Sequence, residues 1–444
     1  MHPGPALSSL FWLLPAVATS AGSVPQTFPW HSDAVIRTQV VNSLADTGPG
    51  SLREAILQAN ALPGPDLIRF ASDGDLFRQP QTIVLNSPLP EIRDALVIDG
   101  YIDDMLWQAS GVTLDGQTRY RILSVAPGIH ARISYLTLTR GSADKGGALF
   151  NAGISVLSGV LLDNNRASDN GGALYNAGSL FLINSTLHGN SAHRAGGALY
   201  HAGTALTVTH STFDDNAAPQ GGAIYSTGPA LMNNSIVANS RSPLDCLAEV
   251  DFAAQSRANI IEKSSGCTGI FSREDPGLGK LGRYNGPTRT IPINSRSPAF
   301  NRADNAASLD EAGQPLTWDQ RGNGDPRFAV GIADIGAFEV QPQVLFEVDT
   351  RSDEDIRGCT RSKNDCSLRG ALTLLNQSRR HQVLKFDQEV FRQGVDIHFR
   401  APLPPVTRDL TIDASEVGTV RLGGNHALRA NPGIVLETIN VRLQ

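Results

Sequence analysis

The middle of the chain is built from a tandem repeat with a fixed period. Four copies of the pattern Gly-Gly-Ala-(Leu or Ile)-(Phe or Tyr) recur every 25 residues, beginning at Gly146, Gly171, Gly196 and Gly221. Between them lie short apolar runs, such as residues 180–183, that are bounded by Gly, Asn and Ser and are typical of strands. A unit of two or three short strands cannot bury its own apolar face, so the copies must stack. The repeat therefore predicts an all-β fold, a parallel β-helix with about 25 residues per rung.

The composition excludes several classes of protein. Of 444 residues, 43 are Gly and 26 are Pro, yet 41% are hydrophobic and only 18% are charged, which indicates a folded chain. The 37 basic and 43 acidic residues are spread along the chain, so no basic patch marks nucleic acid or a membrane surface as a partner. The Cys and His residues lack the spacing of a zinc site. We expect a monomer with no cofactor and no metal.

The repeat also assigns directions to its side chains. Strand alternation turns the aliphatic residue of each motif inward and the aromatic residue after it outward. The outward residues form one stacked column, which we take as candidate glycan-binding residues: Phe150, Tyr175, Tyr200 and Tyr225. The alternative is a column that only packs beneath a loop, and burial of the four rings would exclude a binding platform.

Asparagine residues mark the turns of the repeat. Asn tolerates the left-handed backbone conformation, and its side-chain amide can bond to the equivalent residue of the next rung. We expect two internal ladders, one with Asn190 and Asn216 and one with Asn184 and Asn234. His201 and His210 stand where neighbouring rungs have Asn, so we interpret them as substitutions within such ladders.

The start of the chain predicts export. Residues 6–18 form an apolar run followed by small residues, typical of a signal peptide over residues 1–21 with cleavage after Ala18 or Ala21. A buried N-terminal strand or helix is the alternative. No later apolar run approaches the length of about 18 residues that a membrane-spanning helix needs. We expect a secreted or cell-surface location and, in that oxidising environment, two disulfides that join Cys246 to Cys267 and Cys359 to Cys366.

Upstream of the repeats, residues 51–60 are predicted to form a short amphipathic helix. Ser51 and Glu54 fit a capping box, and the apolar residues of one face are Leu52, Ala55, Ile56 and Ala59. The helix is well placed to cover the first rung, which would otherwise expose apolar core and unpaired strand edges. Residues 37–245 are therefore expected to form a β-helix with an N-terminal cap, and its Gly-Gly-Ala repeats span residues 146–240.

Several of these motifs resemble known families. The run Ser51-Leu-Arg-Glu-Ala-Ile56 resembles the CSLREA-type module of secreted bacterial β-helix proteins, although Gly50 stands where that module has its leading Cys. The Gly-Gly-Ala and Phe-x-x-Asn patterns are similar to the repeats of chlamydial polymorphic outer-membrane proteins, which are adhesin-like. Residues 246–339, with Asp319-Gln-Arg-Gly322 and Asp334-Ile-Gly-Ala-Phe-Glu339, are similar to the choice-of-anchor Q domain. The resemblance implies a right-handed β-helix outside a bacterial cell, and no defined reaction.

Residues 345–444 repeat the opening of the chain. Residues 366–376 match residues 50–60, and the later matches include Pro402-Leu-Pro404, Arg408-Asp409 and Pro432-Gly-Ile434. Gly370 replaces Glu54, which removes the capping box from this copy. The copy ends before any Gly-Gly-Ala repeat, so we expect a second β-helix that is truncated or fragmentary. A C-terminal cap is the alternative.

A polysaccharide lyase or glycoside hydrolase of the pectate-lyase type is the main alternative function, because parallel β-helices also carry such enzymes. These need paired carboxylates, or calcium ligands with a basic residue. The candidates near the repeat turns are the acids Asp163, Asp169, Asp214 and Asp215 and the bases Arg140 and Lys145. Solvated polar turns explain the acids equally well, and nothing in the sequence places an acid beside the bases. We therefore assign no catalytic residue.

The sequence favours an exported bacterial surface protein that binds extracellular glycans, or proteins of a host or neighbouring cell, along the outer side of the coil. A structural spacer without a ligand is the third possibility.

Overall fold

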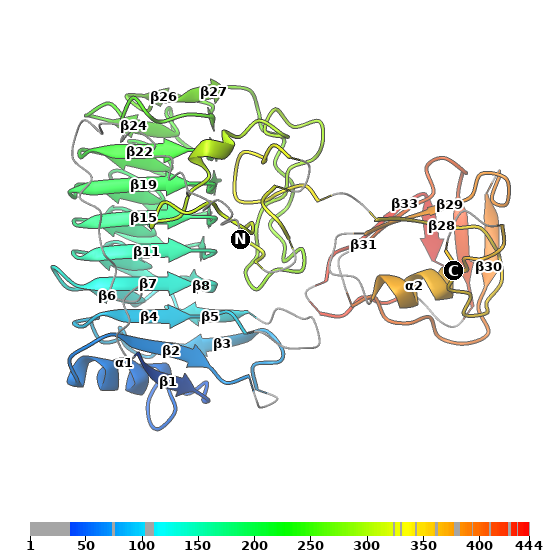
Figure 1. Cartoon of the computed structure of the whole chain (residues 1–444), viewed down its shortest axis with the longest axis horizontal. Helices are drawn as coiled ribbons and strands as arrows, with labels where there is room; N and C mark the ends of the chain where they lie inside the picture. Colours follow the sequence, from blue (N-terminus) through cyan, green and yellow to red (C-terminus); the bar gives the residue numbers. More distant parts are fainter. Residues whose placement is uncertain are drawn as a thin grey trace, which may run out of the picture.

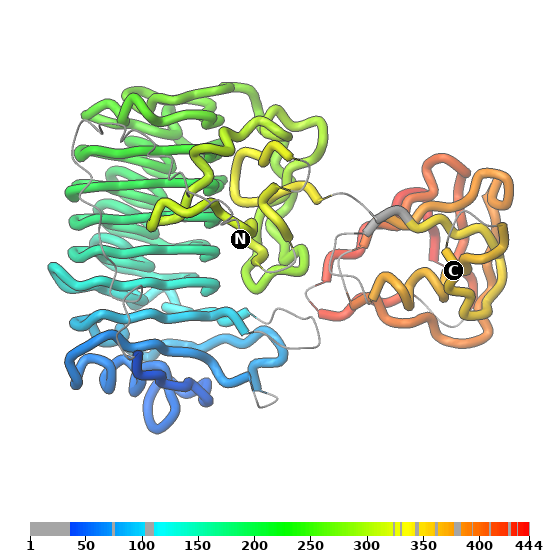
Figure 2. Tube along the Cα trace, in the orientation of Figure 1, coloured from blue at the N-terminus to red at the C-terminus, as the bar shows by residue number. Residues whose placement is uncertain are grey.

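The computed structural model describes two parallel β-solenoids, each with its own hydrophobic core (Figure 1 and Figure 2). The predicted all-β class, the rung of about 25 residues and the short N-terminal helix are confirmed. The handedness of the coil stays a prediction. The proposed signal peptide and the pair Arg408-Asp409 lie outside the described residues, which are 36–72, 76–102, 111–322, 325–328, 331–341, 344–359, 363–376, 382–392, 394–407, 410–424, 428–432 and 434–443.

The first solenoid is made of stacked parallel sheets, to which successive rungs contribute one strand each. Sheet A holds β1 (Arg37–Val41), β2 (Asp66–Phe70), β4 (Leu96–Asp99), β7 (His130–Ser134), β11 (Ile154–Ser158), β15 (Ser179–Ile183), β19 (Ala205–Thr209) and β22 (Ala230–Asn233). Sheet B holds β3 (Gln81–Val84), β5 (Val112–Asp115), β8 (Leu136–Thr139), β12 (Leu161–Asp163), β16 (Thr186–His188), β20 (Thr212–Asp214), β23 (Ile236–Ala238), β25 (Asn259–Ile261) and β27 (Ile270–Ser272). Sheet C holds β6 (Leu123–Val125), β10 (Leu149–Asn151), β14 (Leu174–Asn176), β18 (Leu199–His201), β21 (Ile224–Ser226), β24 (Cys246–Ala248) and β26 (Ser264–Ser265). Sheet D is the shortest, with β9 (Ser142–Lys145), β13 (Arg166–Asn170) and β17 (Ser191–Ala192).

The Gly-Gly pair of each repeat turns the chain from the sheet D side into sheet C. Gly171 has a φ of +67°, a conformation that favours glycine. A Cβ on Gly172 would lie 2.1 Å from the carbonyl oxygen of Gly197 in the next rung. The aliphatic residue that follows points into the core, as predicted, and this holds for Leu149, Leu174, Leu199 and Ile224. The glycine excess therefore reflects corners at which two rungs touch through backbone.

The first rung is covered by α1 (Leu52–Ala61), whose buried residues are the predicted Leu52, Ala55, Ile56 and Ala59. Ser51 Oγ accepts a hydrogen bond from the Glu54 backbone N–H at 3.2 Å. The reciprocal half of the capping box is not formed, because the Ser51 N–H donates to the Gly48 carbonyl and the Glu54 carboxylate accepts from Gln58 instead. The capping-box prediction is thus correct for the serine alone.

The far end of the first solenoid is closed by a disulfide. Cys246 and Cys267 have their sulfur atoms 2.04 Å apart, and both belong to the main core. β24 to β27 continue sheets B and C beyond residue 245, so the coil extends into residues 246–339, the segment similar to the choice-of-anchor Q domain.

Replacing both Cys246 and Cys267 by Ser should lower the free energy of unfolding of the first solenoid by about 3 kcal/mol, since the bridge closes a loop of 21 residues. The measurement is urea denaturation of the oxidised wild type and the double variant. Equal midpoints would contradict a stabilising role for this bridge.

The second solenoid repeats the opening of the first. One sheet holds β28 (Val344–Val348), β29 (Gln382–Phe386), β31 (Leu410–Asp413) and β33 (Leu436–Ile439), and the other holds β30 (Val395–His398), β32 (Val420–Gly423) and β34 (Val441–Leu443). The cap is α2 (Leu368–Leu375), where Ser367 Oγ accepts from the Gly370 N–H. A Cβ on Gly370 would lie 1.8 Å from the Ile356 carbonyl oxygen, which explains why glycine replaces glutamate here. Cys359 and Cys366 lie at disulfide distance before this helix.

Residues 273–341, which we call the strap, leave the coil and run back along its side (Figure 1). In its described part the strap holds the 3-10 helix η2 (Asn305–Ala307) and no strand. Its apolar residues Ile293, Ala299 and Ile335 pack on Ile236 and Ile260 of sheet B. The strap thus covers outer faces of the solenoid that would otherwise be apolar surface.

Candidate functional site

The aromatic residues of the four repeats form one stacked column on the outer face of sheet C. Adjacent ring centroids, from Phe150 to Tyr225, are 5.4, 5.1 and 5.2 Å apart, with interplanar angles of 5°, 7° and 11°. The stacking follows from the strand register, in which Phe150 pairs with Tyr175, Tyr175 with Tyr200 and Tyr200 with Tyr225. Each ring therefore covers the face of the next, and only ring edges and hydroxyl groups are presented to solvent.

The four rings are not equally accessible. Phe150, Tyr175 and Tyr200 are half-buried, whereas Tyr225 is only 9% exposed, so the expectation of four exposed rings is not met. The Tyr225 hydroxyl donates to the Glu249 carboxylate beside it, and this hydrogen bond raises the pKa of Tyr225 to about 12. The residues of the column that offer free hydroxyl edges are Tyr175 and Tyr200.

Charged side chains flank the column. The Arg121 guanidinium lies over the Phe150 ring at 5.2 Å, and the Lys145 ammonium lies 5.1 Å from the centroid of Tyr175. Arg194 pairs with Asp169 at 3.3 Å on the neighbouring sheet D side. Phenolic hydroxyls next to cations can bind a polar, extended ligand through hydrogen bonds. Stacking of a sugar ring on a free aromatic face is not what this geometry offers.

Two of the four candidate acids meet on the outer face of sheet B. The register aligns Asp163, His188 and Asp214 on three successive rungs. His188 Nδ1 is 3.0 Å from Asp163 and its Nε2 is 3.8 Å from Asp214. Arg289 of the strap donates to the second oxygen of Asp163 at 2.7 Å. This cluster was missed in the sequence because His188 stands alone in its repeat position.

The charges of this cluster are paired with one another, which does not favour acid–base catalysis. Asp163 is buried, and although burial opposes its ionisation, His188 and Arg289 hold the pKa of Asp163 below its usual range. Burial raises the pKa of Asp214, whose Oδ1 accepts from Asn239. Because both Asp163 oxygens have partners, the carboxylate is not available to a substrate. We interpret the cluster as a charge ladder that also holds the strap.

His188 should give the cluster a measurable pH dependence. Its hydrogen bond to Asp163 raises the pKa of His188, so the stabilisation is fully present below the ordinary pKa of about 6.5 and is lost as the pH rises through the raised value. We expect His188→Gln to lower the unfolding free energy at pH 6 by more than at pH 9, as measured by urea denaturation. Exposed His193→Gln is the control, and an equal cost of His188→Gln at both pH values would contradict the assignment.

The remaining candidate residues are engaged in surface pairs. Asp215 occupies a turn with a φ of +54° and pairs with Arg241 at 2.9 Å. Arg140 forms an ion pair with Asp115, an acid that nothing in the sequence placed beside it. Strand pairing on consecutive rungs causes this, since Asp115 ends β5 and Arg140 follows β8. Within the described ranges, no group of three or more Cys, His, Asp or Glu side chains could hold a metal ion.

The asparagine ladders occur inside the corners of the coil. Asn190 Nδ2 donates to Asn216 Oδ1 at 3.0 Å, and Asn165 extends this ladder by one rung. A second ladder joins Asn151 to Asn176 at 2.7 Å and Asn176 to His201 at 2.9 Å. The second ladder includes His201, the predicted substitution of histidine for asparagine. In the sequence, this ladder is indicated by the polar residue that follows the aromatic residue of each repeat.

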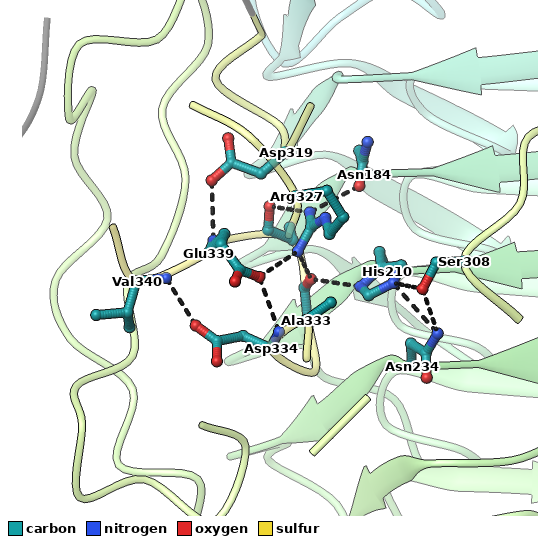
Figure 3. A network of polar contacts seen from close by, with 12 residues as sticks. Asn184, His210, Asn234, Ser308, Asp319, Arg327, Ala333, Asp334, Glu339 and Val340 are labelled. Atoms are coloured by element: carbon teal, nitrogen blue, oxygen red, sulfur yellow. Dashed lines mark hydrogen bonds and ion pairs between the residues drawn. The ribbon is translucent and has the colours of Figure 1, made fainter. Parts of the chain in front are cut away.

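Asn184 and Asn234 do not form a ladder with each other. They lie with His210 in the turns between sheets A and B, and all three bind the strap (Figure 3). Asn184 donates to the Trp318 carbonyl at 2.8 Å and accepts from Arg327 at 2.7 Å. Asn234 accepts from the Asp304 N–H at 2.8 Å. Asn234 Nδ2 also lies 3.2 Å from His210 Nε2 in the neighbouring rung, so the ladder prediction holds for this pair. It is wrong for Asn184, whose side-chain partners belong to the strap, 134 and 143 residues away in sequence.

A known family model matches part of the chain. The model of the Chlamydia polymorphic membrane protein repeat matches residues 159–177 and 210–227, so these parts of the coil are similar to that repeat. A search of curated proteins finds no significant match. The described helices include none long and apolar enough to cross a membrane. The repeats and the β-solenoid together fit a bacterial surface protein.

Proposed function

We propose that the chain is exported to the outside of a bacterial cell and binds a polar, extended ligand along the outer face of sheet C. The observation that supports this most directly is the column of stacked rings, from which Tyr175 and Tyr200 offer hydroxyl edges beside Lys145. Extracellular glycans are the favoured ligand class, since they present many hydroxyl groups in a repeating chain. Proteins of a host or neighbouring cell are the second class.

The position of the strap supports this choice of face, because the strap covers sheets A and B and the aromatic column lies on sheet C. The strap binds the turns between sheets A and B and packs on their outer sides. Its apolar contacts, with Val156, Ile183 and Ile236 among them, are on those two sheets. The similarity to a bacterial surface repeat adds the location, because proteins on a cell surface meet glycans and other cells.

The test is binding of the purified chain to a glycan array and to intact cells. Replacing Tyr175 and Tyr200 by Phe keeps the stacked rings and removes only the two hydroxyls, so binding should fall by about tenfold or more if each lost hydrogen bond contributes about 1 kcal/mol. Tyr120→Phe, a half-buried tyrosine outside the column, is the matched control and should bind as wild type.

Full binding by the double variant would contradict the assignment of the site. Absence of any binding would favour the structural spacer. Release of unsaturated or reducing sugars from polyuronates, abolished by Asp214→Asn with Asp215→Asn, would favour the enzyme, although the paired state of Asp163 argues against it.

A further inference from the structure

Besides its apolar contacts, the strap binds the coil through polar contacts near one buried cluster. The Gly336 N–H donates to the Asn234 carbonyl at 2.8 Å, and the Ala337 N–H donates to Thr212 Oγ1 at 3.0 Å. Both amides belong to the segment Asp334-Ile-Gly-Ala-Phe-Glu339. The docking of the strap therefore depends directly on the geometry of that segment.

The cluster beneath this segment contains more acids than bases. Its four carboxyl groups and two guanidinium groups are all buried, and they belong to Asp319, Asp325, Asp334, Glu339, Arg321 and Arg327. Figure 3 shows four of these residues, Asp319, Asp334, Glu339 and Arg327. Arg321 pairs with Asp319 at 2.6 Å and with Asp325 at 3.1 Å. Arg327 is then the remaining cation of the cluster for Asp334 and Glu339. Its shortest distance to the Glu339 carboxylate is 3.7 Å.

Glu339 is a buried acid of this cluster and, within the described part of the chain, has one carboxylate oxygen without a hydrogen bond and no cation nearer than 3.7 Å. Its Oε2 accepts from the Asp334 N–H at 2.8 Å, whereas its Oε1 has no hydrogen-bond partner among the described residues. Both Asp334 oxygens, by contrast, accept backbone N–H groups, from Asn301 and from Val340. An uncompensated buried carboxylate is costly, so the neutral acid is the form that this site accommodates.

We propose that the strap is a proton-controlled cover: it is docked firmly while Glu339 holds a proton, and it loosens when that proton passes to solvent, uncovering the outer apolar faces of sheets A and B. These faces include Val156 and Ile183, which Leu316 of the strap covers, and Ile236.

The surroundings of Glu339 agree with this assignment. Burial raises the pKa of Glu339 to about 8 and the pKa of Asp334 to about 6. Burial also holds the pKa of His210, the titratable group of the coil that touches the strap at Gly336, well below its ordinary value, so His210 stays neutral at neutral pH. The other titratable and charged groups around the cluster are Arg321, Arg327, Asp319, Asp325 and, from the coil, Tyr135.

The sign of the effect follows from linkage. An acid with a raised pKa in the docked state binds its proton more tightly there than in the open state. The opening equilibrium therefore rises by up to about tenfold per pH unit between the ordinary pKa of about 4.5 and the raised value, and is level above it. Glu339 thus favours docking under acidic conditions and loosens the strap toward pH 8.

The experiment is hydrogen–deuterium exchange of the full chain between pH 5 and pH 9, expressed as protection factors corrected for intrinsic exchange. Peptides that contain Gly336 and Ala337 report strap docking, and peptides from the Gly-Gly-Ala repeats report the coil. In the wild type, protection of the strap peptides should fall by up to about a hundredfold per pH unit below about pH 6, where Asp334 and Glu339 both contribute, and by up to about tenfold per pH unit from there to about pH 8, while the repeats stay protected.

Glu339→Gln removes the titrating proton of this residue while keeping the shape of the side chain. Its strap protection should therefore be nearly independent of pH above about pH 6, where only Glu339 titrates in the wild type, and higher than wild type at pH 8. Exposed Glu274→Gln in the same segment is the matched control and should behave as wild type.

A wild-type profile that is flat with pH, or a Glu339→Gln profile with the wild-type slope, would overturn the proposal. So would a parallel loss of protection in the repeats, which would indicate global unfolding. If Glu339→Gln does not fold, Asp334→Asn together with the wild-type profile decides, since Asp334→Asn should reduce the slope below about pH 6 only.

Discussion

Gly172→Ala should lower the free energy of unfolding of the first solenoid by about 4 kcal/mol. The new methyl group would lie 2.1 Å from the Gly197 oxygen and 2.5 Å from the Ser191 oxygen, both backbone atoms of the next rung. These backbone atoms can move away from the methyl group only if the two rungs separate. We expect about 2–3 kcal/mol from overpacking and about 1 kcal/mol for each of the two hydrogen bonds that link Gly172 to Gly147 and to Gly196.

Gly128→Ala is a reference for this prediction, because it adds a methyl group without a steric contact at a positive φ that Gly172 does not have. Gly128 has a φ of +74° but no atom within 4 Å of an added Cβ, so it isolates the cost of the left-handed conformation, about 1–2 kcal/mol. Urea denaturation followed by circular dichroism compares the two variants. A smaller loss for Gly172→Ala than for Gly128→Ala would show that the rungs do not touch through backbone at this corner.

Arg321→Met should destabilise the first solenoid by about 3–5 kcal/mol, because it leaves a buried acid pair without its cation. Arg321 is fully buried, and its guanidinium carbon also lies 4.0 Å from the centroid of Phe338. Burial opposes the charge of this arginine, but Asp319 and Asp325 raise the pKa of Arg321 above its ordinary value. Methionine keeps much of the apolar volume and removes only the charge and its hydrogen bonds.

The control for this substitution is Arg296→Met, an exposed arginine of the same strap. It should change stability by less than about 0.5 kcal/mol, as expected for a surface site. Thermal unfolding followed by circular dichroism compares the two variants with the wild type. Equal stability of the two variants would contradict a structural role for the buried cluster.

The parts of the fold that repeat in sequence were predictable from sequence. Because the period is 25 residues, residues 25 positions apart are expected to be neighbours on adjacent rungs. The inward leucines, the stacked rings and the Asn190–Asn216 contact therefore follow from the pattern. Each of these contacts joins a residue to its equivalent in the next rung. The alternation of side chains along a strand and the 25-residue period are enough to predict a contact of that kind.

The contacts of the strap could not be predicted in this way. Asn184 looks like a ladder residue because it is spaced as a turn residue, yet its partners are Trp318 and Arg327, which belong to no repeat. Asn234 contacts its rung neighbour His210 but also accepts from Asp304 of the strap. The same holds for His188, whose neighbours Asp163 and Asp214 come from repeats but whose cluster is completed by Arg289. Motifs such as Asp319-Gln-Arg-Gly322 show that a segment matters, and only the three-dimensional structure shows where it docks.

The central claim is that each 25-residue repeat forms one rung, and oxidative cross-linking of paired cysteines tests it most directly. Disulfides need Cα atoms about 4.4–6.8 Å apart, and neighbouring rungs are about 4.8 Å apart. The variant with Tyr175→Cys and Tyr200→Cys, which are register partners on adjacent strands, should therefore cross-link in high yield. The variant with Tyr175→Cys and Tyr225→Cys, two rungs apart at about 9.6 Å, should not. Equal yields for the two pairs, or cross-linking of the distant pair alone, would contradict the assigned register and with it the solenoid.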